Sequence, residues 1–267
     1  MSARGPLATL AVLGIVAGIV LGAGTVAGVG PLATAVPPDR VTDPGEMLAR
    51  SLQATLDASA VHLEGRVSGH LPGALLDRPE PSVSLDGTML EGDARPRDGR
   101  TRAHVTSPGL DLVLDTVTVW NDAWYRTASD GPWERASLGA ASAGVGVDIN
   151  PLTLVDRLRS YLSTPGLHPT VRDVACASAS GRCREIRLDA GSDPAGILAA
   201  LLPNERSANL PAVDTVVTLQ TDRATLRPAK LLVDAASADG SLVVHLVLVT
   251  SRWDTDLRID EPQVSQP

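Results

Sequence analysis

Most of the chain after residue 60 alternates between apolar and polar side chains with a period of two. At the start of this region Val61, Leu63 and Val67 alternate with polar or charged residues. Because successive side chains of a strand point to opposite faces, this alternation predicts half-buried β-strands. Turn-forming residues separate about eleven such stretches: 61–67, 83–89, 101–106, 110–119, 123–127, 171–177, 184–189, 213–221, 229–236, 241–250 and 257–260.

The stretch 241–250 differs from the others because it is apolar on both faces apart from His245. A strand with two apolar faces is covered on both sides, so we expect it near the centre of the sheet. The remaining strands have one polar and one aliphatic face, which is typical of an antiparallel sheet with a single covered side.

Three stretches carry a helix start signal, in which Asp or Asn precedes a proline. Asp43 is followed by Glu46 at the spacing of a capping box. The stretch that follows Asp193 is short and almost wholly apolar, so it is expected to be buried or to cover an apolar surface. The three predicted helices cover residues 44–57, 151–162 and 194–202.

The order of these elements is helix, strands, helices, strands, which indicates an α+β fold. We expect one domain over residues 39–262, built on a large curved antiparallel sheet with helices covering its concave face. Residues 263–267 form a short tail.

The first 38 residues are much more apolar than the rest of the chain. Arg4 is the only charged side chain before Asp39, and the stretch between them is apolar or small. At ~1.5 Å per helical residue, about 20 such residues cross a bilayer core. The positive amino-terminal flank predicts that the chain after this segment lies outside the cytoplasm.

Two fates of residues 1–38 remain open. Ala33, Thr34 and Ala35 have the small-x-small form of a cleavage site, which favours a signal peptide. An apolar run longer than the usual ~7–15-residue core of a signal peptide favours a retained anchor, as does the four-residue spacing of Gly14, Gly18 and Gly22. The protein is therefore expected to be either single-pass membrane-anchored or secreted.

The amino-acid composition excludes one class of function and predicts the character of the interior. The formal net charge of -8 excludes the basic surface of a nucleic-acid-binding protein. There is no Phe and only 2% of residues are aromatic, so the interior is aliphatic. The two cysteines, Cys176 and Cys183, predict a disulfide in an exported chain, since two further zinc ligands are missing nearby.

No spacing typical of a catalytic site occurs, and we expect a protein that is not an enzyme and has no cofactor or metal. His62 and His104 fall on polar strand faces and are expected to be solvated. Asp254, Asp256 and Asp260 are expected to be alternating acids on an exposed edge strand.

The whole arrangement resembles the LolA-type lipoprotein-carrier fold, and within it the LppX/LprG group of actinobacterial cell-envelope lipoproteins. The chain lacks the lipobox cysteine usual in that group. The resemblance extends over most of residues 43–262 and is carried by these segments: 43–52, 60–67, 117–126, 131–133, 150–152, 221–228 and 259–262.

The resemblance implies a half-open β-barrel whose hydrophobic cavity holds acyl chains of lipids or lipoglycans in the cell envelope. Arg102 or Arg126 near a rim would then meet a phosphate head group. The predicted cavity-lining residues are Val61, Leu63, Val67, Val83, Leu85, Leu112, Leu158, Leu198 and Leu201.

Other interpretations stay open at this point. The aliphatic face is equally compatible with an ordinary packed core. Proteins of this fold also include membrane-anchored sensor modules that bind a protein partner in the envelope, which is the alternative function. The aromatic residues Trp120, Trp124, Tyr125 and Trp133 crowd one hairpin and are expected to act as a structural anchor.

Overall fold

The computed structural model describes residues 37–76, 79–95, 98–107, 110–120, 122–137, 169–176, 181–189 and 213–263. Its strands are β1 (Val61–Pro72), β2 (Ser82–Ser84), β3 (Thr88–Ala94), β4 (Asp98–Ser107), β5 (Leu110–Val119), β6 (Asp122–Arg126), β7 (Glu134–Ser137), β8 (Thr170–Ala175), β9 (Arg182–Asp189), β10 (Val213–Asp222), β11 (Pro228–Ser237) and β12 (Val243–Ser251). Its helical elements are η2 (Pro38–Arg40), α2 (Pro44–Leu56) and η3 (Gly73–Leu76).

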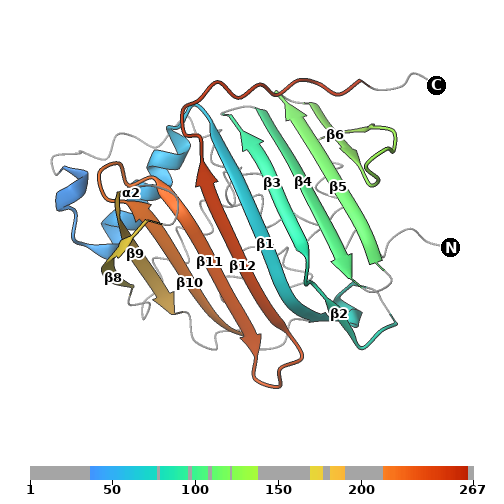
Figure 1. Ribbon diagram of the computed structural model, residues 1–267, viewed down its shortest axis with the longest axis horizontal. Coiled ribbons are helices and arrows are strands. Elements are labelled where there is room, and N and C mark those ends of the chain that lie inside the picture. Colours follow the sequence, from blue (N-terminus) through green and yellow to red (C-terminus); the bar gives the residue numbers. More distant parts are fainter. Residues whose placement is uncertain are drawn as a thin grey trace.

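All twelve described strands belong to one antiparallel sheet (Figure 1). The order is β7-β6-β5-β4-β3-β1-β12-β11-β10-β9-β8, with the short β2 paired to the end of β1. The first and the last strands of the chain meet at the centre, where His62–His70 pairs with Val243–Ser251. The prediction that the stretch 241–250 is a central strand is thereby confirmed.

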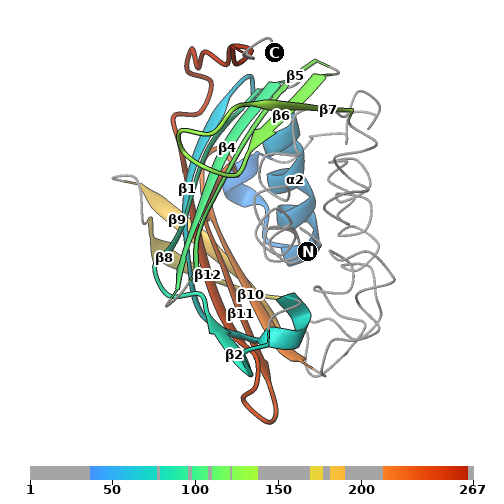
Figure 2. The ribbon, with the colours of Figure 1, turned by 90° about the vertical axis from the view of Figure 1, so that its right-hand side faces the viewer.

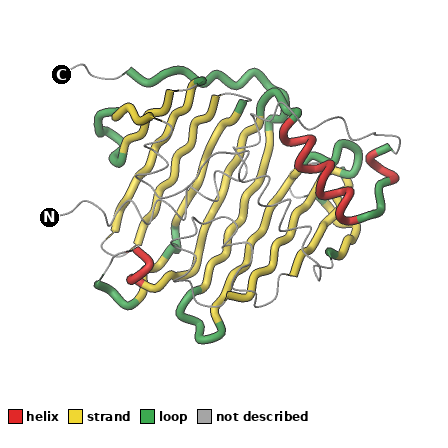
Figure 3. Tube along the Cα trace, turned by 180° about the vertical axis from the view of Figure 1, so that it is seen from behind, coloured by secondary structure: helices red, strands yellow, loops and turns green. Residues whose placement is uncertain are grey.

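The sheet is curved, and α2 lies on its concave side (Figure 2). Seen from behind, α2 lies at one end of the sheet, away from β5 and β6 (Figure 3). It packs against β11 and buries Met47, Leu48 and Ser51. The predicted N-cap is confirmed, because the Asp43 carboxylate accepts a hydrogen bond from the Glu46 amide at 2.7 Å.

The other predicted helices, 151–162 and 194–202, lie outside the described residues, as do residues 1–36 of the predicted membrane or signal segment. In the part of the chain that the structure describes, no helix is long and apolar enough to span a bilayer.

Two strand predictions are wrong. The stretch 83–89 is not one strand, because a turn containing Gly87 at φ 86° separates β2 from β3. Val83, Leu85 and Met89 look like one alternating series in the sequence, which conceals the break, but Leu85 is buried and Met89 is 54% exposed. The stretch 257–260 forms no strand; Figure 1 shows the C-terminal segment running past the upper ends of the strands. The strand β7 was not predicted.

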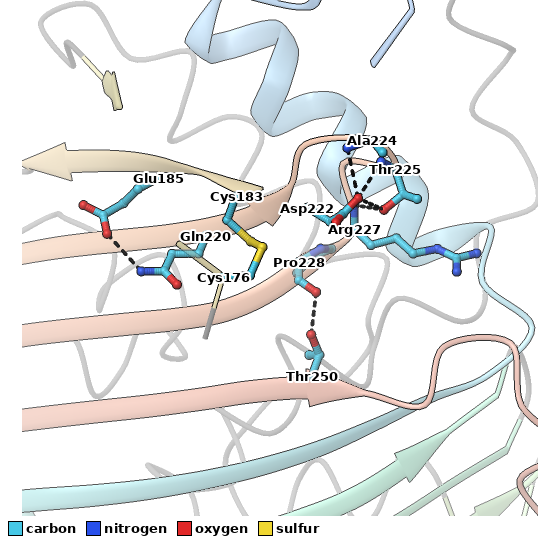
Figure 4. Close-up of a disulfide and its surroundings, with 10 residues drawn as sticks. All are labelled: Cys176, Cys183, Glu185, Gln220, Asp222, Ala224, Thr225, Arg227, Pro228 and Thr250. Carbon is cyan, nitrogen blue, oxygen red and sulfur yellow. Dashed lines mark hydrogen bonds between the residues drawn. A yellow bond between two sulfur atoms is a disulfide. The ribbon is translucent and has the colours of Figure 1, made fainter. Parts of the chain in front are cut away.

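The outermost hairpin, β8–β9, is closed by the predicted disulfide between Cys176 and Cys183 (Figure 4). The two Cα atoms are 4.9 Å apart, and Cys183 is fully buried. Among the described strands β8 pairs with β9 alone, so the disulfide holds the last strand at this end of the described sheet.

Removal of the disulfide is expected to lower stability without changing the fold. The double variant Cys176→Ser, Cys183→Ser should lose about 2–3 kcal/mol of unfolding free energy, since a short closed loop no longer restricts the unfolded chain. Denaturant titration measures the loss. Wild-type protein with reductant should match the variant, and equal stability of the oxidised and reduced forms would contradict the prediction.

Candidate functional site

The two faces of the sheet differ in their chemistry. Residues directly opposite each other in neighbouring antiparallel strands share a face, so the register assigns every described strand position to one side. Leu63 of β1 lies opposite Thr250 and Gly92, and Val67 lies opposite Leu246 and Thr88. We call this side, on which α2 packs, the inner face; its centre comprises Val61, Leu63, Gly65, Val67, Thr88, Leu90, Gly92, Ala94, Leu246, Leu248 and Thr250.

Five of the predicted cavity residues come together on or beside the inner face. Val61, Leu63 and Val67 follow one another along β1, and all are buried. Val83 of β2 lies opposite Leu71 at the lower end of β1, and buried Leu85 follows it. These five predicted residues therefore lie close together, along β1 and beside the end of β1 that pairs with β2.

The other four predicted cavity residues have side chains that lie outside the described part of the structure. Leu112 lies in β5 opposite Val105, in register with the inner face, but its side chain is outside the described part. Leu158, Leu198 and Leu201 lie outside the described residues. Sequence reasoning missed the inner-face residues of β3 and β12. The stretch 241–250 is apolar on both faces, so its pattern does not show which side faces inward, and inner-face Thr88 of β3 is polar.

The inner face of β1, β3, β4, β5, β10, β11 and β12 carries no charged residue at its described positions. Its polar groups there are hydroxyls. Thr101 and Thr116 form a hydrogen bond across β4 and β5. Thr88 is buried, and its Oγ1 has no hydrogen-bond partner. The centre of the inner face is therefore aliphatic and uncharged, and it is buried, with Leu63 and Leu248 fully inaccessible to solvent.

Small side chains make the inner face unevenly filled. At Gly65 of β1, a Cβ would lie 2.4 Å from Leu248 Cδ2 and 3.2 Å from Leu90 Cβ, so neighbouring leucines already occupy that space. At Gly99 of β4, no described atom lies within 4 Å of such a Cβ. Gly99 lies opposite Ala94 and Thr118, so the open position belongs to the inner face.

The opposite side, the outer face, carries the charges. Arg102 and Arg126 were expected near a cavity rim, but both bind Asp115 on the outer face, so that prediction is wrong. Arg102 donates to both carboxylate oxygens at 2.7 and 2.9 Å, and Arg126 Nε donates at 2.7 Å. Burial raises the pKa of Asp115, but the hydrogen bonds from the two arginines outweigh it and the pKa is lowered.

The prediction of a solvated His62 is also wrong. His62 is buried, and its Nδ1 lies 2.7 Å from Asp93 Oδ1. Arg100 donates to the other oxygen of Asp93 at 2.7 Å. The sequence shows that these residues alternate on one face, but it does not show that β1, β3 and β4 align them in one row. His104 does lie on the outer face, opposite Met89.

The acidic residues near the carboxyl terminus are not on an edge strand. Asp254 accepts hydrogen bonds from the Ser59 amide and hydroxyl at 2.8 and 3.1 Å, and it pairs with Arg227. The backbone hydrogen bond from Ser59 is the main cause of its lowered pKa. Asp254 thus ties the C-terminal segment to the start of β1. Among the described residues, no group of His, Cys, Asp and Glu is arranged to hold a metal ion.

The aromatic hairpin has a packing role. Trp124 is buried with Val117 and with Ile259 of the C-terminal segment, and Trp133 packs against this cluster. The Arg126 guanidinium lies 4.8 Å from the centre of the Trp133 ring. These contacts fasten the C-terminal segment to the outer face, as expected for a structural anchor.

No protein-family profile matches the sequence, and no curated protein sequence matches it. Among solved structures, the Mycobacterium tuberculosis lipoprotein LppX is 14% identical, with a TM-score of 0.48 over 81% of this chain and 98% of LppX. The LolA superfamily protein NE2245 from Nitrosomonas europaea is 13% identical, with a TM-score of 0.26 over 82% and 96%. MucB, solved in complex with MucA(peri), is 13% identical, with a TM-score of 0.32 over 80% and 58%. LppX and a LolA-superfamily protein, from the groups that the sequence resembles, are thus among the solved structures that match this chain.

The two inner-face glycines are expected to respond differently to the same substitution. Gly65→Ala should destabilise the fold by about 1–3 kcal/mol, because the added methyl group overlaps Leu248. Gly99→Ala should be neutral or stabilise by up to about 1 kcal/mol, because the site is open and alanine restricts the unfolded chain. Thermal and denaturant unfolding of both variants measure the difference; equal losses would show that Gly99 is as closely packed as Gly65.

The ion pairs of Asp115 are expected to make stability depend on pH. A carboxylate whose pKa is lowered by folding stabilises the protein above its unfolded pKa, near 3.8, and this contribution is lost as the pH falls through the lowered folded value. Asp115→Asn should therefore cost about 1.5–3 kcal/mol at pH 7 and progressively less below pH about 4. Denaturant titrations between these pH values measure the difference. Asp214→Asn, at an exposed strand position, is the control, and a pH-independent loss for Asp115→Asn would contradict the prediction.

Proposed function

We propose that this protein binds the acyl chains of a lipid or lipoglycan against the inner face of its sheet and carries or shields that lipid in the bacterial cell envelope. The observation that carries the proposal is the inner face itself, which is curved, aliphatic, uncharged over its described central strands and open at Gly99. A packed core needs no open position on a concave face, whereas a binding site does.

The energetics of such a site are those of hydrophobic burial. Acyl chains gain about 25 cal/mol for each Å² of apolar surface removed from water, less the cost of ordering the chains. No cationic residue is needed, and the ion pairs of Asp93 and Asp115 in the central strands lie on the outer face.

In this proposal the protein is a carrier and not an enzyme, because holding an acyl chain requires no nucleophile, base, metal or cofactor. The predicted helices 151–162 and 194–202 would complete the cover of the concave face, and Leu158, Leu198 and Leu201 would then line the site together with Val61, Leu63 and Val67. Residues 39–262 would lie outside the cytoplasm.

Filling the open position is expected to remove the ligand while leaving the fold intact. Gly99→Trp places a large side chain on the inner face where no described atom obstructs its Cβ. Met89→Trp is the matched control, since Met89 is 54% exposed on the outer face. Native mass spectrometry of protein made in a bacterial envelope should show bound lipid in the wild type and in Met89→Trp, and several-fold less in Gly99→Trp.

Native mass spectrometry of the same proteins can also contradict the proposal. A wild-type domain that purifies without lipid from a lipid-rich envelope identifies the inner face as a core. Equal lipid retention in all three proteins shows that lipid binds away from Gly99. Co-purification of a single envelope protein with a lipid-free domain would instead support the alternative, a protein-binding regulator. Leu63→Trp reports on packing, and overpacking at this fully buried position should cost about 1–3 kcal/mol.

A further inference from the structure

The residues that lead into α2 are held tightly to the body of the protein. We call residues 37–43 the N-terminal strap; it contains the short helical turn η2 and the buried Val41. Arg184 of β9 donates to the backbone carbonyl of Asp39 at 2.6 Å and to that of Val41. The Arg184 side chain is only 8% exposed, and its Nε lies 3.7 Å from Asp173 Oδ1. Burying the Arg184 guanidinium without these two carbonyls would cost free energy, because its N–H groups would lack acceptors. The two hydrogen bonds therefore hold the strap in place, and we call them the Arg184 clamp.

This clamp limits how far the domain can move from the apolar amino-terminal run. That run ends at Val36, and Arg184 already holds the carbonyl of Asp39. Three extended residues span about 10 Å at most. The part of the domain beside the strap therefore stays within about 10 Å of the end of that run.

The start of β9 and the turn between β10 and β11 lie beside the strap. Arg184 lies opposite Thr221 of β10, and the Arg223 amide bonds to the Arg182 carbonyl, which brings the turn between β10 and β11 beside the start of β9. Figure 4 shows this turn, with Ala224 and Thr225, next to α2. We call the strap, the start of β9 and this turn the strap edge.

The charges of the strap edge differ from those of the whole chain, which has a net charge of -8. Arg40 and Arg182 are exposed there and form no ion pair with any described residue. The neighbouring Asp222 carboxylate is occupied by the amides of Ala224 and Thr225 and by the Thr225 hydroxyl. Asp39 and Asp43 of the strap are exposed as well, so the edge is mixed in charge. Arg40 and Arg182, which pair with no described residue, are its guanidinium groups available to phosphate.

We propose that residues 1–36 are retained in the membrane and that the strap edge docks on the anionic phospholipid headgroups of that bilayer, with Arg184 fixing the orientation. An acidic domain on a free tether would be repelled by an anionic surface. A clamped strap instead presents Arg40 and Arg182 to the headgroups and directs the β5–β7 end of the sheet away from them. This inference does not depend on what the inner face binds.

Energy transfer between the protein and the bilayer tests the orientation. The full chain, with its native disulfide intact, is reconstituted into vesicles of phosphatidylcholine and phosphatidylglycerol that contain a rhodamine-labelled lipid. A donor dye is attached to Ala224→Cys at the strap edge or to Ser129→Cys in the loop between β6 and β7, at the opposite end of the sheet. Both positions are exposed. We expect several-fold higher transfer from position 224 than from position 129.

Two variants test the role of the clamp. Arg184→Met should abolish the difference between the two dye positions, while Arg187→Met, at an exposed position in the same strand, should preserve it. Because Arg184→Met also removes buried hydrogen bonds, a second variant leaves the fold untouched: a Gly-Ser linker of about 20 residues inserted after Val36, with an r.m.s. span of about 25 Å, should reduce transfer from position 224.

Three results would overturn the inference. One is equal transfer from positions 224 and 129 in the unmodified chain, and another is transfer from position 224 that the long linker leaves unchanged. The third is a mature protein whose amino-terminal sequence begins at Val36, which means that the anchor is cleaved. None of these bears on lipid retention by the inner face, so failure here and failure of the proposed carrier function are distinguishable.

Discussion

The pairing of β1 with β12 is the contact on which the rest of the architecture depends. It joins β3–β7, which follow β1 in the chain, to β8–β11, which precede β12, and so makes one sheet from two sets of strands. The inner face is continuous only across this seam, where Leu63 meets Thr250 and Val67 meets Leu246. Gly65 contributes by leaving room for the Leu248 side chain, which a Cβ at that position would displace.

The separation of charge between the two faces follows from the same register. Each strand alternates, and the antiparallel pairing aligns the alternation of neighbours, so charged residues gather in rows on the outer face. Asp115 is the clearest case, since two arginines from the strands on either side of β5 offset its burial. Over the central strands, these ion pairs leave the inner face to aliphatic and hydroxyl side chains; on β9, buried Arg184 lies on the inner side, opposite Thr221.

Much of the fold was predictable because short stretches of sequence determine most of its helix and strand positions. Period-two alternation predicted most of the strands, the Asp43 signal predicted the start of α2, and two cysteines in an exported chain predicted the disulfide. The errors arose where the outcome depends on tertiary position. Leu85 is buried in a turn, so the alternation does not reveal the break at Gly87, and the apolar residue Ile259 packs on Trp124 without belonging to a strand.

The candidate site was predictable to a lesser extent. The inner-face residues of β1 follow from alternation alone, whereas the partners of charged residues require the register. Arg126 has the same appearance in the sequence whether it faces a ligand or Asp115, and His62 has the same appearance whether it is solvated or buried beside Asp93. The open position at Gly99 depends on what surrounds it in three dimensions, and no sequence pattern distinguishes it from the closely packed Gly65.

The central seam also has a consequence for the order in which the molecule is made. Residue 62 pairs with residue 251, so the middle of the sheet cannot close until almost the whole chain is available. Such long-range pairing slows folding, because the chain must close a very large loop before any contact compensates for it. In the envelope location proposed for this protein, the delay would keep the chain unfolded during transport across a membrane, because the central pairing forms only after the last strand has crossed.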